Sequence, residues 1–187
     1  MSRKLILILG KTGTGKTTLA KKLIEKEKRL LIFDPLQEYS GSIFSTFESL
    51  CDYFLDSSLK EKFRVVCRFE TDIEPEFLFR LAWELRDVTV LVEEASLFLS
   101  PRTPTFFHNL INQGRHRNIS IIAIVRRAPE LSIQFRAMCT SVITFEQTEP
   151  RDLDHLENLG FEFNDEKFDQ FEYKIWGEPI FDIFPKK

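Results

Sequence analysis

Residues 10–17 carry the strongest chemical signal in the sequence. They read Gly-Lys-Thr-Gly-Thr-Gly-Lys-Thr and match GxxxxGK[ST], the phosphate-binding loop, in full. The glycines allow positive φ and a close approach of the backbone to oxyanions. Successive amide N–H groups and the start of the following helix attract negative charge.

The same loop predicts a set of nucleotide contacts. We expect Lys16 to reach the β- and γ-phosphates, Thr17 to offer its hydroxyl to Mg²⁺ and Thr18 to contact the α-phosphate. A glycine-rich turn that merely caps a helix is the less informative alternative. The predicted nucleotide-binding residues are Gly10, Lys11, Thr12, Gly13, Thr14, Gly15, Lys16, Thr17 and Thr18.

A pair of carboxylates supplies the second signal. Glu93 and Glu94 directly follow Val88–Val92, a β-branched run typical of a buried strand. Paired acids at a strand end suit metal-assisted phosphoryl transfer, in which Glu93 would hold Mg²⁺ or its water and Glu94 would deprotonate the attacking water. Neighbouring acids are often only solvated, and it is the phosphate loop upstream that favours the functional interpretation.

Arginines flank the next buried run, Ile119–Val125. Arg115 and Arg117 precede it, and Arg126 follows it. Arginines at strand ends can contact a γ-phosphate, from the same chain or from a neighbouring subunit, and they can also track nucleic-acid phosphates. We therefore treat Arg115, Arg117 and Arg126 as candidate catalytic residues together with Lys16 and Glu94, although surface solubility alone would also explain the cluster.

The elements that must position these residues alternate between strands and helices. Apolar runs predict strands, which lie at 4–9, 30–33, 63–69, 88–92, 119–125 and 141–145. Helical spacing and proline or glycine boundaries predict helices at 16–28, 43–54, 75–86, 105–113, 130–138 and 150–158. Residues 171–176 and 180–183 flank Gly177-Glu178-Pro179 and predict a terminal hairpin. This order predicts a three-layer α/β fold of the P-loop NTPase (RecA/ASCE-like) type with a mainly parallel sheet.

Composition sets the outer limits. The 187 residues suit a single domain over 1–187, and 43% apolar with 29% charged residues argues against a disordered chain. The three cysteines show no CxxC spacing, and we expect 19 phenylalanines mainly to fill the core. No apolar run is long enough for a membrane span, so we expect a cytoplasmic location.

The net charge of −3 hides an uneven distribution. Residues 1–30 hold nine basic and two acidic residues, residues 102–136 hold six arginines and one glutamate, and residues 146–187 hold twelve acidic and five basic residues. An acidic protein can still bind a polyanion when its basic residues share a face.

The order of these motifs resembles the HerA–FtsK group of P-loop ATPases, which includes viral genome-packaging ATPases. The resemblance is carried by residues 10–17, by Asp34-Pro-Leu-Gln-Glu-Tyr39, by Leu91-Val-Glu-Glu-Ala95 and by the segment from Gly114 to Arg127. It spans residues 4 to about 158. It departs from the family at Glu93, where Asp is usual, and at Arg126, where the sensor is usually Gln.

The resemblance implies an ATP- and Mg²⁺-dependent motor that moves double-stranded DNA. It implies a homo-oligomeric ring, often a hexamer, in which Arg115 or Arg117 completes the neighbouring site. A chain of this size suits a viral or mobile-element packaging enzyme, in the host cytoplasm or with the virion, with a capsid or packaging-vertex protein as a possible partner. Two alternatives stay open: a nucleoside or nucleotide kinase, against which the Glu93-Glu94 pair argues, and an ATP-dependent switch that moves nothing.

Overall fold

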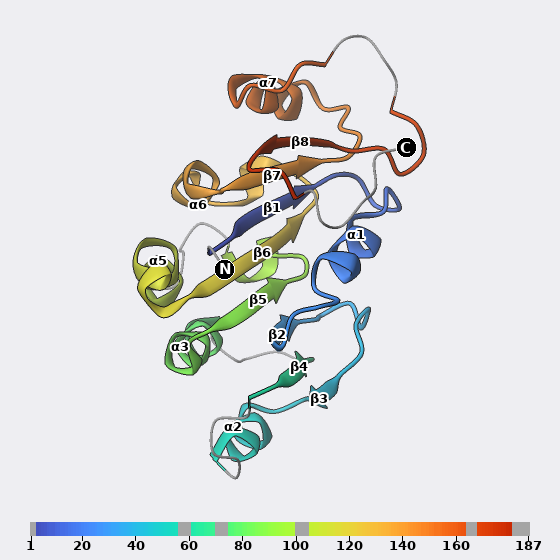
Figure 1. The fold of residues 1–187 in the computed structure, drawn as a ribbon. Coiled ribbons are helices and arrows are strands. Elements are labelled where there is room, and N and C mark those ends of the chain that lie inside the picture. The colour runs from blue at the N-terminus through green and yellow to red at the C-terminus, as the bar shows by residue number, and fades with distance from the viewer. Residues whose placement is uncertain (1–2, 56–60, 70–74, 100–104, 164–167, 181–187) are drawn as a thin grey trace.

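The computed structural model describes residues 3–55, 61–69, 75–99, 105–163 and 168–180. Eight strands form one sheet in the order β3-β4-β2-β5-β6-β1-β7-β8 (Figure 1). The strands are β1 (Leu5–Leu9), β2 (Arg29–Phe33), β3 (Ser42–Phe44), β4 (Phe63–Cys67), β5 (Val88–Val92), β6 (Ile119–Val125), β7 (Ser141–Thr144) and β8 (Lys174–Gly177). Strands β1 to β7 pair in parallel, and β8 joins β7 in the antiparallel sense. The predicted mainly parallel α/β fold is confirmed.

Helices cover both faces of the sheet (Figure 1). They are α1 (Lys16–Leu23), α2 (Phe47–Leu55), α3 (Pro75–Leu85), α4 (Ser96–Leu99), α5 (Thr105–Gln113), α6 (Ile133–Met138) and α7 (Pro150–Asn158), with 3₁₀ turns at Gly114–Arg117 and Ala128–Glu130. Among the described helices, none is long and apolar enough to cross a bilayer.

Alternation along β1 divides the core into two layers. Leu5, Leu7 and Leu9 face the cluster that holds α2, α3, α5, α6 and α7, whereas Ile6 and Ile8 face α1. This is the pattern expected of a parallel strand buried on both faces.

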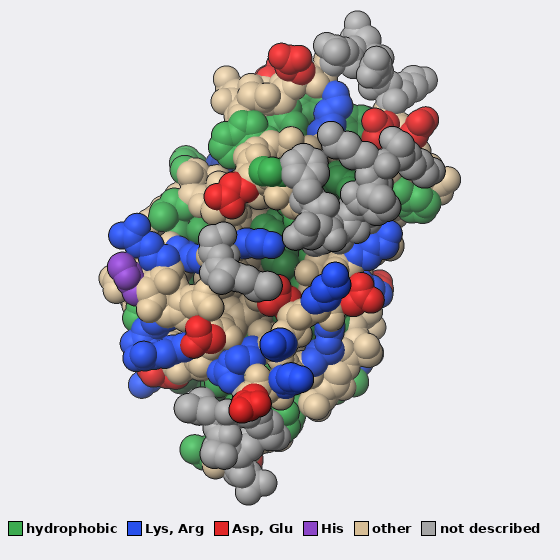
Figure 2. Space-filling view, in the orientation of Figure 1, with side chains coloured by type: hydrophobic (Ala, Val, Ile, Leu, Met, Phe, Trp, Pro, Cys, Tyr) green, Lys and Arg blue, Asp and Glu red, His purple; other side chains and the backbone are tan. Residues whose placement is uncertain are grey.

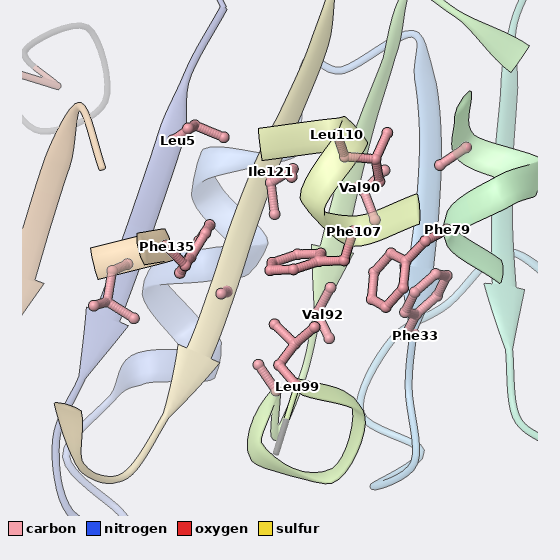
Figure 3. Packing of buried hydrophobic residues seen from close by; sticks show 14 of the residues in the cluster. Leu5, Phe33, Phe79, Val90, Val92, Leu99, Phe107, Leu110, Ile121 and Phe135 are labelled. Atoms are coloured by element: carbon pink, nitrogen blue, oxygen red, sulfur yellow. The ribbon is translucent and has the colours of Figure 1, made fainter. Parts of the chain in front are cut away.

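Phenylalanines line the larger layer, as the composition predicted. The rings of Phe33, Phe79, Phe107 and Phe135 form a continuous row with successive centroid distances of 5.4, 4.9 and 5.4 Å (Figure 3). All four side chains are fully buried. The row ties β2 to helices from three later parts of the chain, and so it fixes the sheet that carries the site.

The structure corrects several predicted boundaries. The helix predicted over 43–54 is wrong at its start, because Ile43 and Phe44 pair with β4 as strand β3. Helix α2 then begins at Phe47, where the Thr46 hydroxyl caps the first turn by accepting from Ser49 N at 3.2 Å. The helix predicted over 16–28 ends at Leu23 instead. The helix predicted over 130–138 begins later, at Ile133, where α6 starts with Ser132 as its N-cap; the 3₁₀ turn at Ala128–Glu130 precedes it.

The C-terminal segment adds an edge strand. Residues 174–177 form β8 on the outer side of β7, so the segment covers a sheet edge. The first strand of the predicted terminal hairpin, 171–176, begins only at Lys174. The second, 180–183, lies outside the described residues except for Ile180.

Candidate active site

The carboxyl edge of the sheet gathers most of the predicted site residues. Residues 10–17 follow β1, Asp34 follows β2, Glu93 and Glu94 follow β5, and Arg126 follows β6. Because these strands are parallel and adjacent in the sheet, their ends meet at one edge. Loops from distant parts of the sequence are therefore brought together here.

The phosphate-binding loop has the backbone that the glycine pattern predicted. Gly10, Gly13 and Gly15 all have positive φ, and the loop leads directly into α1 at Lys16. Glycine is required at position 10 on steric grounds as well, because a Cβ atom there would lie 2.7 Å from Phe145 Cβ. The amide groups of the loop and the start of α1 thus form an anion-binding concavity.

Lys16 is folded back onto its own loop. Its Nζ donates hydrogen bonds of 2.7 Å to the carbonyls of Gly10 and of Lys11. Burial lowers the pKa of the Lys16 ammonium, while the charges of Glu93 and Glu94 act in the opposite direction. The ammonium is held at the loop by groups that phosphate oxygens can replace.

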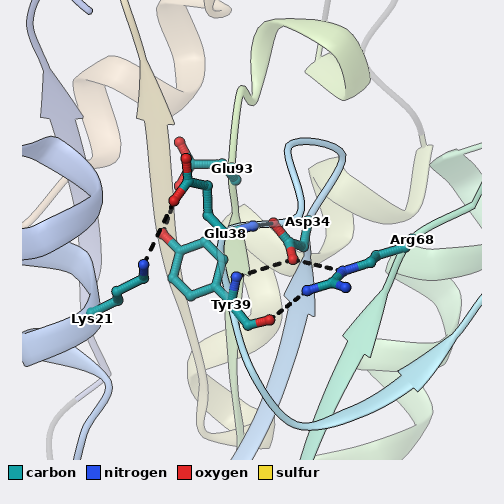
Figure 4. Close-up of polar contacts among 6 residues, drawn as sticks. All are labelled: Lys21, Asp34, Glu38, Tyr39, Arg68 and Glu93. Carbon is teal, nitrogen blue, oxygen red and sulfur yellow. Dashed lines mark hydrogen bonds and ion pairs between the residues drawn. The ribbon is translucent and has the colours of Figure 1, made fainter. Parts of the chain in front are cut away.

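Glu93 is a buried carboxylate with a fixed orientation. Its side chain is only 2% exposed, and its Oε2 accepts a 2.5 Å hydrogen bond from the Tyr39 hydroxyl (Figure 4). Burial raises the pKa of Glu93, while the hydrogen bond from Tyr39 and the charge of Lys16 oppose that shift. Burial and the neighbouring Glu93 also raise the pKa of the Tyr39 hydroxyl, so that it stays a donor.

Asp34 and Arg68 hold the loop that carries Tyr39. Asp34 is fully buried, and its carboxylate accepts from the backbone N–H of Glu38 at 2.8 Å and of Tyr39 at 3.1 Å. Arg68, just after β4, donates to Asp34 Oδ2 at 3.0 Å and to Tyr39 O at 2.5 Å (Figure 4). These contacts fix the conformation of residues 34–39, and so they fix the position of the Tyr39 hydroxyl that contacts Glu93.

Lys21 closes this loop from the side of α1. Its Nζ lies 3.6 Å from Glu38 Oε2 and 5.5 Å from the centre of the Tyr39 ring. Both groups of the ion pair are about half exposed, so we regard the pair as a minor contribution to stability.

Glu94 lies beside Arg126 at the ends of β5 and β6. Arg126 Nε is 3.1 Å from Glu94 Oε1. Glu94 has φ +47°, a left-handed conformation that is uncommon for a residue with a side chain. Glu94, the predicted base, and Arg126 are thus paired with each other. Arg127, the next residue, instead bonds the buried Asp152 at 2.8 Å.

Arg115 and Arg117 lie at the opposite edge of the sheet. They precede β6, whereas residues 10–17 follow the parallel strand β1 next to it. They therefore lie far from the phosphate-binding loop of their own chain. Arg117 stacks over the Trp83 ring at 4.1 Å and donates to Trp83 O at 3.0 Å. Arg115 is exposed and contacts His116.

The donor set fits Mg²⁺. The ion takes oxygen ligands and is usually held by one or two carboxylates or hydroxyls together with substrate phosphates. Thr17, in the first turn of α1, and Glu93 offer such oxygens, and Tyr39 holds only Oε2 of the carboxylate. Among the described residues, no group of three or more His, Cys, Asp and Glu side chains could hold a metal ion. A bound Mg²⁺ would therefore need phosphate oxygens as further ligands.

Sequence reasoning missed two parts of this edge. It quoted Asp34 and Tyr39 only for their resemblance to a family and did not place them in the site. It did not single out Arg68 at all. Arg68 lies inside the strand predicted over 63–69, and that predicted end hid its position. Strand β4 ends at Cys67, so Arg68 directly follows a strand, as Asp34 and Glu93 do.

One face of the molecule is mixed in charge. Figure 2 shows Lys and Arg side chains gathered across the middle of one face, with Asp and Glu among them. A uniform basic patch is therefore absent from the described part of this face.

Comparison with known proteins places the chain among P-loop ATPase domains. Residues 1–138 match the sequence profile of the family described as "Helicase HerA, central domain". A curated relative, the DNA packaging ATPase P9 of Enterobacteria phage PRD1, is 27% identical over 129 residues. That alignment covers 67% of this chain and 56% of the phage protein, so the match spans little more than half of the relative.

Solved structures agree on the fold. The genome packaging NTPase B204 of Sulfolobus turreted icosahedral virus 2, in complex with sulfate, has a TM-score of 0.73 at 15% identity, covering 95% of this chain and 92% of that one. The same NTPase with AMPPCP has a TM-score of 0.67 at 18% identity, covering 83% and 81%. VirB4 of Thermoanaerobacter pseudethanolicus has a TM-score of 0.58 at 15% identity, covering 82% and 80%. At these identities the likeness shows the fold alone.

Proposed function

The chain belongs to the HerA central-domain family, and we propose that it is an ATPase that packages or translocates double-stranded DNA. The proposal rests on one observation: the phosphate-binding loop lies at the same edge of the sheet as Glu93, Glu94 and Arg126. The phage PRD1 relative is a DNA packaging ATPase and B204 is a genome packaging NTPase, and both support the same function.

The residues of the phosphate-binding loop bind and orient the triphosphate. Lys16 exchanges the carbonyls of Gly10 and Lys11 for phosphate oxygens, and the loop amides neutralise the remaining charge. Thr17 and Glu93 would hold Mg²⁺, which would neutralise charge on the phosphates. Glu93 is kept in place by Tyr39, so little reorganisation is needed when the nucleotide binds.

Glu94 orients the attacking water and takes its proton. Its carboxylate is paired with Arg126, so Arg126 must release it before it can act. The γ-phosphate is a stronger partner for the guanidinium than a carboxylate because it carries more charge. We infer that Arg126 moves to the γ-phosphate on ATP binding and thereby frees Glu94.

A neighbouring subunit completes the site. Arg115 lies at the opposite sheet edge and is exposed, as a residue that acts on another copy of the chain must be. This arrangement favours a ring oligomer in which the carboxyl edge of one subunit faces the amino edge of the next.

The test is the steady-state ATPase rate with and without linear double-stranded DNA, over a range of protein concentrations. We expect a DNA-stimulated rate that rises more than linearly with protein, with Lys16→Ala and Glu94→Gln inactive. A rate indifferent to DNA and concentration would contradict the motor, and phosphorylation of a nucleoside without net hydrolysis would indicate a kinase. DNA binding through phosphates should also weaken steeply with added salt.

A further inference from the structure

The order of strands around the phosphate-binding loop fixes the direction in which a bound nucleotide must extend. This step rests on the proposed function. Strands β6 and β5 lie on one side of β1 and carry Arg126 and the two glutamates, whereas β7 lies on the other side. The γ-phosphate belongs beside the glutamates, so the nucleoside has to leave the loop on the side of β7.

A cavity of about 230 Å³ lies on that side. It is lined by residues 11–14 of the loop, by Glu146 just after β7 and by residues 168–172 just before β8. Because β8 runs antiparallel to β7, its first residue, Lys174, pairs with Thr144 at the end of β7. The segment 168–172 is therefore delivered to the same edge as the phosphate-binding loop (Figure 1).

Phe171 is the unusual residue of this cavity. Its side chain is 57% exposed although it is a large aromatic ring, and its φ of +67° is a conformation that non-glycine residues rarely adopt. A Cβ atom placed on Gly15 would lie 2.9 Å from Phe171 Cδ1, so the ring lies directly against the loop. An exposed ring held in strained backbone next to a phosphate site needs a reason beyond packing.

The carboxylates that line the cavity outnumber the lysine, Lys11, and so disfavour binding of further phosphate. Glu146, Asp169 and Glu172 contribute carboxylates to its lining. Part of this charge is already engaged, because Glu172 Oε2 accepts from Asp169 N at 2.7 Å and Glu146 pairs with Lys11 at 3.7 Å. Acceptors of this kind suit hydroxyl and amino donors of an uncharged group.

We propose that this cavity is the nucleoside subsite, in which Phe171 stacks on a purine base and the carboxylates accept hydrogen bonds from ribose hydroxyls and an exocyclic amino group. A flat aromatic ring gains most from a large base, so purine nucleotides bind more tightly than pyrimidine nucleotides. An exocyclic amino group distinguishes ATP from ITP, so ATP binds more tightly than ITP.

The test compares ATP with inorganic tripolyphosphate, which has the phosphates but no nucleoside. Binding of each is measured by titration calorimetry for the wild-type chain and for Phe171→Gly, Phe171→Trp and the control Ile175→Ala on β8. We expect Phe171→Gly to weaken ATP binding about 10- to 100-fold and to leave tripolyphosphate binding unchanged. Phe171→Trp should keep wild-type affinity for ATP, and Ile175→Ala should change neither ligand.

The glycine variant also separates recognition from folding. Glycine adopts positive φ without strain, and this relief offsets the greater flexibility of the unfolded chain, so Phe171→Gly should melt close to the wild-type temperature. Equal ATP affinity in Phe171→Gly and wild type would overturn the nucleoside subsite while leaving the ATPase intact. Parallel loss of tripolyphosphate binding and of melting temperature would show that Phe171 only supports the loop. A wild-type chain that binds neither ligand would overturn the proposed function itself.

Discussion

The Tyr39 hydroxyl donates a 2.5 Å hydrogen bond to Glu93 Oε2, and both groups are buried. This contact joins the loop after β2 to the end of β5, which are adjacent strands of the sheet. The other carboxylate oxygen of Glu93, Oε1, takes no part in this hydrogen bond. A glutamate has one more rotatable bond than the aspartate usual at this position, and Tyr39 restricts that added freedom.

Tyr39→Phe is expected to weaken metal-dependent turnover without unfolding the chain. The variant keeps the buried ring and removes only the donor that orients Glu93. Loss of a partner that orients a metal ligand typically costs 10- to 100-fold in metal affinity or activity, so we expect a loss of about that size. The measurement is the Mg²⁺ concentration for half-maximal ATPase rate, with metal-free nucleotide affinity as the control. An unchanged Mg²⁺ requirement would mean that Tyr39 serves only the core.

Arg126→Gln is expected to reduce discrimination between ATP and ADP. If the guanidinium moves from Glu94 to the γ-phosphate, its removal costs a charge-assisted hydrogen bond that only ATP makes, worth about 1.5–3 kcal/mol. ATP affinity should then fall about 10- to 100-fold while ADP affinity stays the same. Competition with a fluorescent nucleotide measures both values. If the ratio of the two affinities does not change, Arg126 has no contact with the γ-phosphate.

His155 gives the chain a stability that depends on pH. Burial and the nearby Arg136 lower the pKa of His155 below its usual 6.5, while Asp152 weakly opposes the shift. The unfolded chain then binds more protons than the folded chain, so the stabilisation is complete above pH 6.5 and is lost as the pH falls through the lower folded pKa. Melting temperatures from about pH 8 to about pH 5 should decline less for His155→Gln, which stays neutral. The same decline in both proteins would exclude His155 as the cause.

Much of the site could be predicted from the sequence because its residues directly follow strands. The loop at residues 10–17 and the pair Glu93-Glu94 are contiguous in sequence, and a short apolar run before each of them predicted a parallel strand. Which strands pair with each other was harder to predict from the sequence. Ile43 lies in a window with helical composition, yet it joins β4 as an edge strand because its partner, Val66, lies in a strand more than twenty residues later. Phe171 owes its place to the antiparallel return of β8, which no local pattern specifies.

The two arginines before β6 should separate into different roles, although the sequence treats them alike. Arg117 is engaged by Trp83 through both its ring and its carbonyl, contacts that together stabilise the fold by about 1–2 kcal/mol. Arg117→Ala should therefore lower the melting temperature. Arg115 is exposed, so Arg115→Ala should fold normally and lose turnover only in the assembled state.

Mixing two inactive variants tests whether Arg115 of one subunit acts at the site of its neighbour. Arg115→Ala keeps its phosphate-binding loop, and Lys16→Ala keeps its arginine, so a mixed ring contains some interfaces with both groups intact. We expect ATPase activity to return when these two inactive proteins are combined. We expect no activity when Lys16→Ala is combined with Glu94→Gln. Lys16 and Glu94 lie at the same edge of one subunit, so every site in that second mixture lacks one of the two residues. Activity that stays absent in the first mixture would show that Arg115 does not act on a neighbour.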